Sequence, residues 1–238
     1  MSENSQVPTE PVAVPPGIIA LVGAPSALPV WRNDLGGLTF RIDGQRYLKW
    51  APADEPELDL AGEAKRMTWA RQWVRVPRVL EQGADTEGSW LITEAIEGRS
   101  AVDPRWITEP GTACFAIGKG LRMLHETLPV PECPFDWSVE YRKLAAREEI
   151  GPPPPVDAVV CHGDACAPNT LLAEDGSVAG HVDLDALGVA DRWADLAVAA
   201  WSTEWNYGPG YEDTVYRGYG IEPDPERIAY YRRLWDIT

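Results

Sequence analysis

The sequence has few of the residues that stabilise small secreted or zinc-dependent domains. Its 238 residues hold four cysteines, too few for a disulfide framework, and three histidines, and the cysteine spacing fits no C-x₂-C zinc pattern. No apolar run approaches the ~20 residues that cross a bilayer, and the chain does not begin with a basic segment followed by an apolar one. We therefore expect a cytoplasmic protein with reduced cysteines and without a structural metal.

Basic residues are also scarce. Lysine and arginine number 21 against 37 aspartates and glutamates, which gives a formal net charge of −16. Nucleic acids and anionic membranes need a basic surface on the proteins that bind them, so we expect neither as a partner. The charge suits a cationic ligand, although surplus carboxylates also keep a protein soluble, and on charge alone solubility is the simpler explanation.

The first part of the chain is rich in strand signals. Residues 1–17 are polar and proline-rich, which predicts a disordered tail. The elements expected next are strands over 38–42, 46–50, 76–80 and 89–95, a helix over 60–73, a hairpin turn at Asp43-Gly44 and a turn at 83–85.

Helix signals dominate the second part. The expected elements are helices over 112–128, 193–205 and 225–234, and strands over 156–161, 170–173 and 178–184. The proline run 152–155 must connect elements, because proline is excluded from helix interiors. A strand-rich lobe followed by a helical lobe predicts an α+β protein with a cleft between the lobes.

The sharpest local signal is His162-Gly163-Asp164 followed by Asn169. An aspartate with an asparagine five residues later matches the H-x-D-x-x-x-x-N loop of kinases, in which the carboxylate faces the attacking hydroxyl and the amide oxygen reaches magnesium. Asp183 ends an apolar strand nineteen residues after Asp164, where a second hard oxygen ligand would hold the same metal. Either motif alone also fits an ordinary turn, but their order and spacing together predict phosphoryl transfer.

Longer segments around these motifs carry a family resemblance. The segments VVCHGDACAPN, GHVDLDALGVADRWADLA and YYRRLWDIT resemble the aminoglycoside phosphotransferase family, and its 3′-phosphotransferase branch in particular. The resemblance implies a bilobal, protein-kinase-like fold with a small strand-rich N-lobe over 18–95, ending in a hinge, and a larger, mostly helical C-lobe over 96–238. It also implies a monomer that uses ATP or GTP with Mg²⁺ to phosphorylate a hydroxyl, the 3′-hydroxyl, of a cationic aminoglycoside antibiotic and so confers resistance.

The resemblance also assigns roles to individual positions. Asp164 matches the catalytic base, and Asn169 and Asp183 match the magnesium ligands. The nucleotide-binding set comprises Lys49 with its ion-pair partner Glu63, the phosphate loop at Gly36-Gly37, and the hinge Thr93-Glu94-Ala95, where backbone groups of Glu94 and Ala95 would bind adenine.

The residues that the resemblance assigns to substrate binding lie at the end of the chain. The resemblance places Asp236 and the terminal carboxylate of Thr238 against the amino-sugar, where carboxylates would bind ammonium groups. Glu204 and Glu212 are further candidates for lining that pocket. The alternative for Asp236 is that it frays with the terminus.

Two further aspartates and two departures from the family pattern complete the expectations. Asp191 is expected to brace the catalytic loop, and Asp195 to cap or anchor the helix that follows. Asp185-Ala186 replaces the usual Gly-Arg, which removes a positive charge near the transferred phosphoryl group. The segment 136–155 is shorter than is usual in the family, so less of the chain is available to cover the acceptor. A kinase for another cationic small molecule and a catalytically weak, nucleotide-binding regulatory module therefore remain as alternatives.

Overall fold

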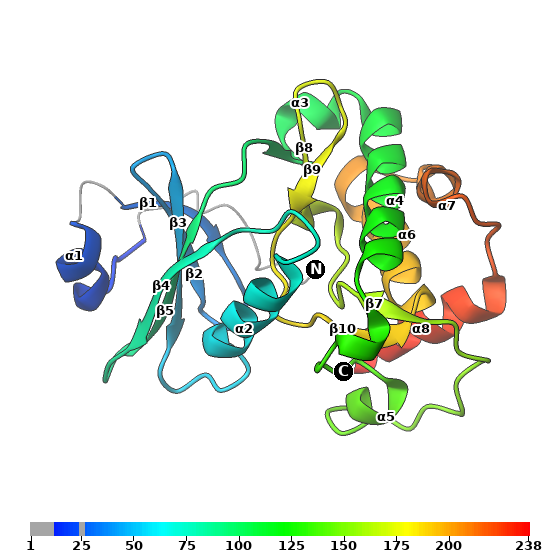
Figure 1. The fold of residues 1–238 in the computed structure, drawn as a ribbon, viewed down its shortest axis with the longest axis horizontal. Helices are drawn as coiled ribbons and strands as arrows, with labels where there is room; N and C mark the ends of the chain where they lie inside the picture. The colour runs from blue at the N-terminus through cyan, green and yellow to red at the C-terminus, as the bar shows by residue number, and fades with distance from the viewer. Residues whose placement is uncertain (1–11, 24–26) are drawn as a thin grey trace. The chain divides into compact units, whose positions relative to one another are not determined.

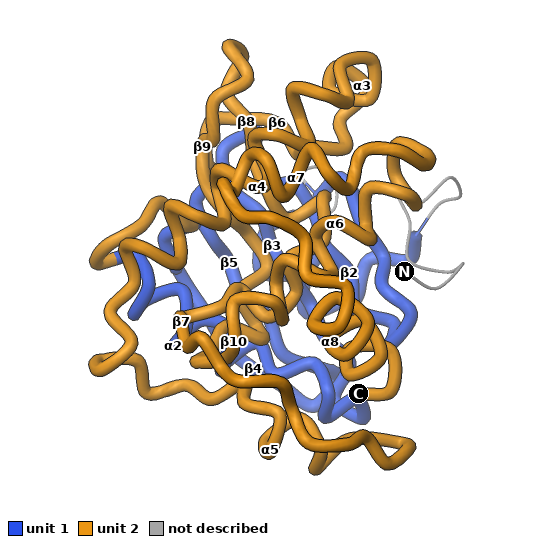
Figure 2. The backbone as a smooth tube through the Cα atoms, turned by 90° about the vertical axis from the view of Figure 1, so that its right-hand side faces the viewer, with its two compact units in different colours: residues 1–71, 77–95 blue, residues 72–76, 96–238 orange. Residues whose placement is uncertain are grey.

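The computed structural model describes residues 12–23 and 27–238 and divides the chain into two compact units. Unit 1 comprises Met1–Arg71 and Pro77–Ala95, and unit 2 comprises Gln72–Val76 and Ile96–Thr238 (Figure 2). Strands dominate unit 1 and helices dominate unit 2, as the sequence predicts. In the described ranges, no helix is both long and apolar enough to cross a membrane.

Unit 1 is built on a five-stranded antiparallel sheet with the strand order β1-β2-β3-β5-β4. The strands are β1 (Ala27–Arg32), β2 (Leu38–Ile42), β3 (Arg46–Pro52), β4 (Val79–Ala84) and β5 (Gly88–Glu94). Along β2, Leu38, Phe40 and Ile42 are buried while Arg41 is exposed, because successive side chains of a strand point to opposite faces. The hairpin predicted around Asp43-Gly44 joins β2 to β3.

Two helices cover the two faces of this sheet. Figure 1 shows α1 (Pro16–Val22) and α2 (Leu60–Ala70) on opposite sides of the strands. Ile18 of α1 belongs to the same core as Ile92, while the neighbouring Leu91 points the other way and is also buried. Burial on both faces holds β3 and β5, which carry the predicted nucleotide-binding residues, in a rigid layer.

Unit 2 combines a set of helices with two small sheets. The elements are β6 (Arg99–Ser100), α3 (Pro104–Ile107), α4 (Pro110–Thr127), α5 (Val139–Arg142), β7 (Ala158–Cys161), β8 (Thr170–Leu172), β9 (Val178–His181), β10 (Gly188–Asp191), α6 (Trp193–Tyr207), α7 (Glu212–Tyr219) and α8 (Pro225–Ile237). Strand β7 pairs with β10, and the predicted hairpin of β8 and β9 pairs through β8 with β6.

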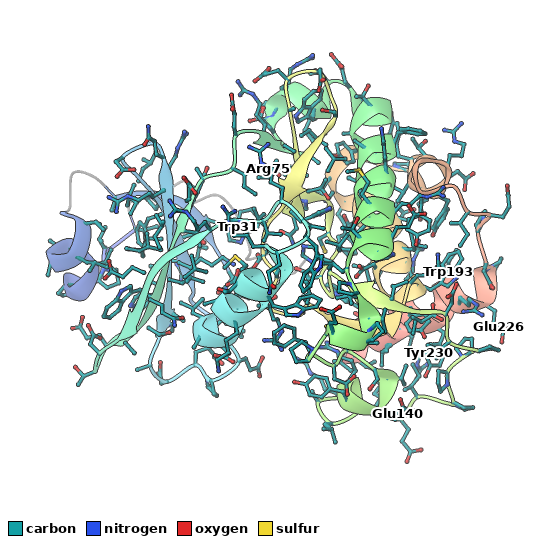
Figure 3. All side chains as sticks on the ribbon, viewed as in Figure 1. Trp31, Arg75, Glu140, Trp193, Glu226 and Tyr230 are labelled. Carbon is teal, nitrogen blue, oxygen red and sulfur yellow. The ribbon has the colours of Figure 1, made fainter. Side chains whose placement is uncertain are left out.

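The core of unit 2 lies among α4, α6, α7 and α8. On α4, which confirms the helix predicted over 112–128, Ile117, Leu121 and Leu124 are buried and form its apolar face. Helix α6 is buried along most of its length, starting at Trp193, which Figure 3 labels. The loops that follow β7 and β9 rest on this core, so the candidate catalytic residues have a rigid support.

Several predicted boundaries are wrong by a few residues. The strand predicted over 76–80 is β4, which starts at Val79, because Pro77 has no N–H to contribute to a ladder. The turn predicted at 83–85 follows instead after β4, where Asp85 Oδ1 accepts hydrogen bonds from the N–H groups of Glu87 and Gly88 at 2.8 and 3.1 Å. An aspartate that bonds its own downstream backbone makes such a turn without a glycine at its start.

The tail and the second helix also end differently from the prediction. Helix α2 ends at Ala70 rather than at residue 73, and residues 72–76 belong to unit 2. Residues 1–11 of the predicted tail lie outside the described residues, and α1 already begins at Pro16, where proline suits the first helical turn. Seven of the described helices and strands were not predicted, namely α1, β1, β6, α3, α5, β10 and α7.

Candidate active site

The predicted catalytic loop runs from the end of β7 to a short 3-10 turn, Ala167–Asn169. Gly163 has φ = 87°, and an added Cβ there would overlap the carbonyl group of Ala186. Only glycine combines this backbone angle with so close an approach. The catalytic loop therefore lies directly against the loop that follows Asp183, and the two predicted motifs meet in space.

Asp164 is held through one of its two carboxylate oxygens. Asn169 Nδ2 donates to the Asp164 backbone oxygen at 2.9 Å and to Asp164 Oδ2 at 3.0 Å. Asp164 Oδ1 is buried and has no hydrogen-bond partner. A buried acceptor without a partner is unfavourable unless a ligand supplies a donor, and an acceptor hydroxyl is such a donor.

The pKa of Asp164 is raised above the ordinary aspartate value by burial and by the negative charge of Asp183. Both causes disfavour the ionised carboxylate. A positive charge bound between the two aspartates would act in the opposite sense and favour the ionised form that a general base needs.

Asp183 is brought next to Asn169 by two hydrogen bonds of its neighbour Val182. Val182 N donates to the Asn169 backbone oxygen at 3.0 Å, and His162 Nε2 lies 2.9 Å from the Val182 oxygen. Asp183 has φ = 64°, a left-handed conformation that aspartate tolerates better than most residues. Because the Asn169 amide nitrogen faces Asp164, its amide oxygen is the end left for a cation, and this oxygen with the Asp183 carboxylate forms the hard donor set that Mg²⁺ prefers.

Asp195 is the brace of the catalytic loop. Its Oδ2 accepts hydrogen bonds from His162 N at 2.6 Å and lies 2.9 Å from His125 Nε2, and its Oδ1 accepts from Gly163 N at 2.9 Å. His125 Nδ1 lies 2.9 Å from the hydroxyl of Tyr219. Burial acts to raise the pKa of Asp195, but the hydrogen bond and charge of His125, the charge of His162 and the Gly163 N–H together lower it.

The expected roles of Asp191 and Asp195 are therefore wrong. Asp195 binds the catalytic loop, whereas Asp191 caps α6 through Trp193 N at 2.8 Å. The second oxygen of Asp191 accepts from Asp157 N and from Arg227 Nη1, both at 2.8 Å. Asp191 is the last residue of β10 and lies just before the helix N-terminus, while Asp195 lies in the first turn of α6, on the side that faces the loop.

Asp195→Asn is expected to destabilise the protein by about 3 kcal/mol, the usual size for breaking a buried, paired charge. The asparagine can offer one oxygen to three donors, and its NH₂ group would face one of them. Denaturant unfolding measures the loss, with Asp54→Asn, on an exposed turn of unit 1, as the matched control that should not change stability. Equal stabilities of Asp195→Asn and the wild type would contradict the bracing role.

Two further residues that support the catalytic loop, His125 through Asp195 and Ser202 directly, were not assigned from the sequence. His125 follows Leu121 by four residues on the apolar face of α4, and Ser202 Oγ of α6 accepts a hydrogen bond from Ala167 N at 2.7 Å. A polar residue on an otherwise buried helix face is the signal that could have identified both.

One group of three potential metal ligands occurs in the part of the chain that the structure describes. Atoms of His125, Cys161 and Asp195 lie within 4.8 Å of one another. Burial and the charges of Asp195 and Asp191 raise the pKa of the Cys161 thiol well above its usual value, so it stays protonated and donates to the Asp191 backbone oxygen at 3.3 Å. The hydrogen bonds described above account for this group without a metal.

In unit 1, the predicted ion pair is formed. Lys49 Nζ lies 2.7 Å from Glu63 Oε1, and the Glu63 side chain is 2% exposed. Lys49 lies in the middle of β3, opposite Leu91 of β5. Glu63 lies in the first turn of α2, which Asp59 caps by accepting from Gly62 N at 2.8 Å. The pair thus joins the sheet to α2 and fixes the ammonium group.

The predicted phosphate loop is a tight turn between β1 and β2. Asn33 Oδ1 accepts a hydrogen bond from Gly37 N at 2.6 Å, and Asn33 N donates to the Gly37 oxygen at 3.0 Å. Gly36 adopts φ = 83°. The asparagine side chain therefore shapes the turn.

The predicted hinge has fewer free groups than expected. Glu94 N donates to the Arg78 oxygen at 2.9 Å, and Ala95 N donates to the Gln45 oxygen at 2.8 Å. Thr93 lies within β5, opposite Tyr47. With both N–H groups engaged, an adenine contact through Glu94 or Ala95 is left to their carbonyl oxygens.

The predicted substrate residues lie at the ends of α6 and α8. Glu204 and Asp236 are exposed and are the sequence neighbours of Trp205 and Trp235, whose ring centres are 5.9 Å apart. Glu212 instead pairs with Arg232 Nη2 at 2.5 Å. The Thr238 hydroxyl accepts hydrogen bonds from Arg142 and donates to the Leu234 oxygen at 2.8 Å, so α8 is anchored and does not fray at this residue.

Comparison with known proteins identifies the family of this constellation. The family model described as "Phosphotransferase enzyme family" matches residues 32–152 and 138–231. Among relatives, an aminoglycoside 3′-phosphotransferase of Streptomyces fradiae is 34% identical over 251 aligned positions, covering 85% of this chain and 91% of the relative. A streptomycin 3′′-kinase of Streptomyces griseus is 34% identical over 271 positions, covering 96% of this chain and 97% of the relative.

Solved structures agree with these relatives. Aminoglycoside phosphotransferase APH(3′′)-Id from Streptomyces rimosus, in complex with ADP and streptomycin, has a TM-score of 0.72 and 29% identity, and the match covers 93% of this chain and 96% of that one. An aminoglycoside 3′-phosphotransferase of type VIII has a TM-score of 0.73 and 31% identity, covering 92% and 96%. The predicted α+β, protein-kinase-like fold class is confirmed.

The aligned lengths also bear on the segment before the catalytic loop. Alignments of 251 and 271 positions exceed the 238 residues of this chain, so the chain lacks positions that these relatives have. The two family matches overlap at residues 138–152, and residues 143–157 form turns and coil. The predicted motifs around Asp164 and Asp183, the Lys49–Glu63 pair and the matches over most of the chain agree, and the chain belongs to the phosphotransferase enzyme family of the aminoglycoside phosphotransferases.

Proposed function

We propose that this protein transfers the γ-phosphoryl group of a nucleoside triphosphate to a hydroxyl of an aminoglycoside antibiotic and thereby confers resistance. The observation that carries the proposal is the Asp164 carboxylate, with one oxygen fixed by Asn169 and the other buried and without a partner. The names of the relatives, which are phosphotransferases and kinases of aminoglycosides, support the substrate class. The net charge of −16 suits a polycationic acceptor.

The reaction follows from the groups in unit 2. Asp164 Oδ1 accepts the proton of the acceptor hydroxyl as its oxygen forms a bond to the γ-phosphorus, and the bond from that phosphorus to the leaving nucleoside diphosphate breaks. Asn169 keeps the carboxylate oriented through Oδ2, and Asp195 keeps the loop in place. The main contribution of Asp164 is to align the acceptor hydroxyl, because phosphoryl transfer depends mostly on alignment and charge stabilisation.

The Asn169 amide oxygen and the Asp183 carboxylate would hold Mg²⁺, which neutralises charge on the nucleotide phosphates. In unit 1, Lys49 is proposed to contact the phosphates, with Glu63 fixing its ammonium group. The turn at Gly36-Gly37 would approach the phosphates through its backbone. The carbonyl oxygens of Glu94 and Ala95 would contact the adenine. The ADP in the Streptomyces rimosus structure supports an adenine nucleotide as donor.

The acceptor hydroxyl has two candidate positions. We start from the 3′-hydroxyl, because the 3′-phosphotransferase of Streptomyces fradiae is 34% identical to this chain. The 3′′-hydroxyl of a streptomycin-like acceptor is the second candidate, because the streptomycin 3′′-kinase has the same identity and covers 96% of the chain. Glu204 and Asp236, which are exposed, and the end of the chain at Thr238 are proposed to bind the ammonium or guanidinium groups of either acceptor.

A coupled assay of ADP release tests this function. Mg²⁺-ATP is supplied with kanamycin, neomycin, streptomycin or a non-antibiotic amine, and Asp164→Asn serves as the blank. We expect turnover with at least one antibiotic that disappears in the blank, and phosphorus–proton NMR of the product then assigns the hydroxyl. Nucleotide binding without turnover on any antibiotic would contradict the proposal and favour another acceptor or a regulatory role.

A further inference from the structure

Three tryptophans form a cluster where α6 packs against α8, two helices that Figure 1 shows side by side. Trp201 and Trp205 lie one turn apart on α6 with their ring centres 4.9 Å apart, and the ring centre of Trp235 on α8 lies 6.1 and 5.9 Å from theirs. All three residues are partly exposed, whereas Trp106 and Trp137 of the same unit are 1% exposed. Aromatic rings that gather on an open surface favour contact with a ligand.

The tryptophan cluster lies beside the catalytic loop. Ser202, which stands between the two tryptophans of α6 in the sequence, accepts a hydrogen bond from Ala167 N, three residues after Asp164. The end of α8 is fixed as well, because Thr238 Oγ1 accepts from Arg142 Nε and Nη2 at 3.1 and 2.6 Å. An aminoglycoside consists of several linked rings, so one ring can reach the cluster while a hydroxyl of another meets the catalytic base.

The chain already stacks one of its own guanidinium groups on this cluster. The guanidinium carbon of Arg232 lies 5.6 Å from the ring centre of Trp201. Its Nη2 lies 2.5 Å from the Glu212 carboxylate, and its Nε donates to the Ala197 oxygen at 3.2 Å. A planar guanidinium can offer its face to an aromatic ring and its N–H edges to oxygens at the same time, whereas an ammonium group is compact and strongly hydrated.

The other two rings of the cluster have carboxylates next to them but no cation from the chain. Glu204 precedes Trp205 and Asp236 follows Trp235, and both acidic residues are exposed. In the described part of the chain, neither carboxylate has an ion-pair or hydrogen-bond partner, and neither ring has a stacked cation. These four residues repeat the two elements that hold Arg232, an aromatic face and a carboxylate.

We propose that the rings of Trp205 and Trp235 form a subsite for a guanidinium group of the acceptor. The carboxylates of Glu204 and Asp236 bind the N–H edges of that group. The inference rests on the proposed function and chooses between its two candidate acceptors. It favours streptomycin, which carries guanidinium groups, over kanamycin and neomycin, which carry ammonium groups, and therefore favours the 3′′-hydroxyl.

Binding without nucleotide tests the subsite first. Streptomycin and kanamycin are titrated by calorimetry into the wild type, Trp205→Leu and Trp235→Leu. Each variant should bind streptomycin about fivefold more weakly, the size of a cation–π contact, while its affinity for kanamycin changes less than about twofold. The matched control is Phe115→Leu, which removes an exposed aromatic ring of α4 and should leave both affinities unchanged. Unchanged streptomycin affinity, or an equal loss for both antibiotics, would overturn the proposal.

The unfolding midpoint of each variant shows whether the loss of a ring has disturbed the packing of α6 and α8. Where a leucine variant is unfolded, Asp236→Asn takes its place, because this side chain is exposed and has no partner among the described residues. Asp236→Asn should weaken streptomycin binding about threefold, since it removes the charge from one charge-assisted hydrogen bond. Wild-type affinity in this variant would count against the subsite.

Turnover with Mg²⁺-ATP separates this inference from the proposed function. In the wild type, kcat/KM should be higher for streptomycin than for kanamycin, and Trp205→Leu should reduce the ratio of the two about fivefold. A wild type that prefers kanamycin or neomycin would overturn the guanidinium subsite and leave the proposed function standing. A wild type that turns over no antibiotic would refute the proposed function, and the calorimetry would still decide whether the two rings bind a guanidinium group.

Discussion

Asp164→Asn is expected to lower kcat by about 10²- to 10⁴-fold, the usual cost of losing a general base, while nucleotide binding stays close to that of the wild type. The structure predicts this separation because only Asp164 Oδ1 is without a partner, whereas Oδ2 accepts from Asn169. An asparagine oxygen can keep the contact with Asn169, so the loop should retain its shape. Single-turnover kinetics and ADP titration measure the two effects separately.

The same substitution at Asp175 provides the control. Asp175 lies in the exposed turn of the β8–β9 hairpin, where its side chain accepts from Ser177 N at 2.9 Å. Asp175→Asn changes the charge of unit 2 by the same amount and should leave kcat unchanged. Full activity in Asp164→Asn would show that another group removes the proton, and an equal loss in both variants would attribute the effect to net charge.

The residues that act through local sequence could be predicted. The loop from His162 to Asn169 needs one aspartate and one asparagine at fixed spacing, and the structure places both side chains in contact. The Lys49–Glu63 pair was also predictable, because it joins the strand and the helix that follow each other in the chain. In each case, the sequence distance sets the geometry.

The contacts that depend on tertiary packing could not be predicted. Asp191 and Asp195 are one helical turn apart, and only the position of α6 against the catalytic loop decides which of them meets the backbone amides of His162 and Gly163. The engaged N–H groups of Glu94 and Ala95 depend in the same way on where Arg78 and Gln45 lie.

Helix α5 shows the same limit most clearly. It is four residues long, too short for a periodic signal, and the segment around it is held by β10 and α8, which lie later in the sequence.

Asp183→Asn is expected to abolish the Mg²⁺ dependence of nucleotide binding. Removing one of two hard oxygen ligands also removes the charge that attracts the cation. The fold should be unaffected, because asparagine tolerates the left-handed backbone at φ = 64° as well as aspartate does. In thermal unfolding, a ligand at a hundred times its Kd stabilises the folded state by about 2.7 kcal/mol, so Mg²⁺ with ADP should raise the midpoint of the wild type more than ADP alone. In the variant the two midpoints should coincide.

Asp43→Asn is the matched control for the backbone, since Asp43 is the other non-glycine residue with positive φ in the described part of the chain, at 47°. It lies in the hairpin turn between β2 and β3, where its carboxylate pairs with Arg46 at 2.6 Å. This variant should keep the extra Mg²⁺-dependent rise of the midpoint. If Asp183→Asn also kept it, the cation would be held by other ligands, and the pairing of Asn169 with Asp183 would not be the metal site.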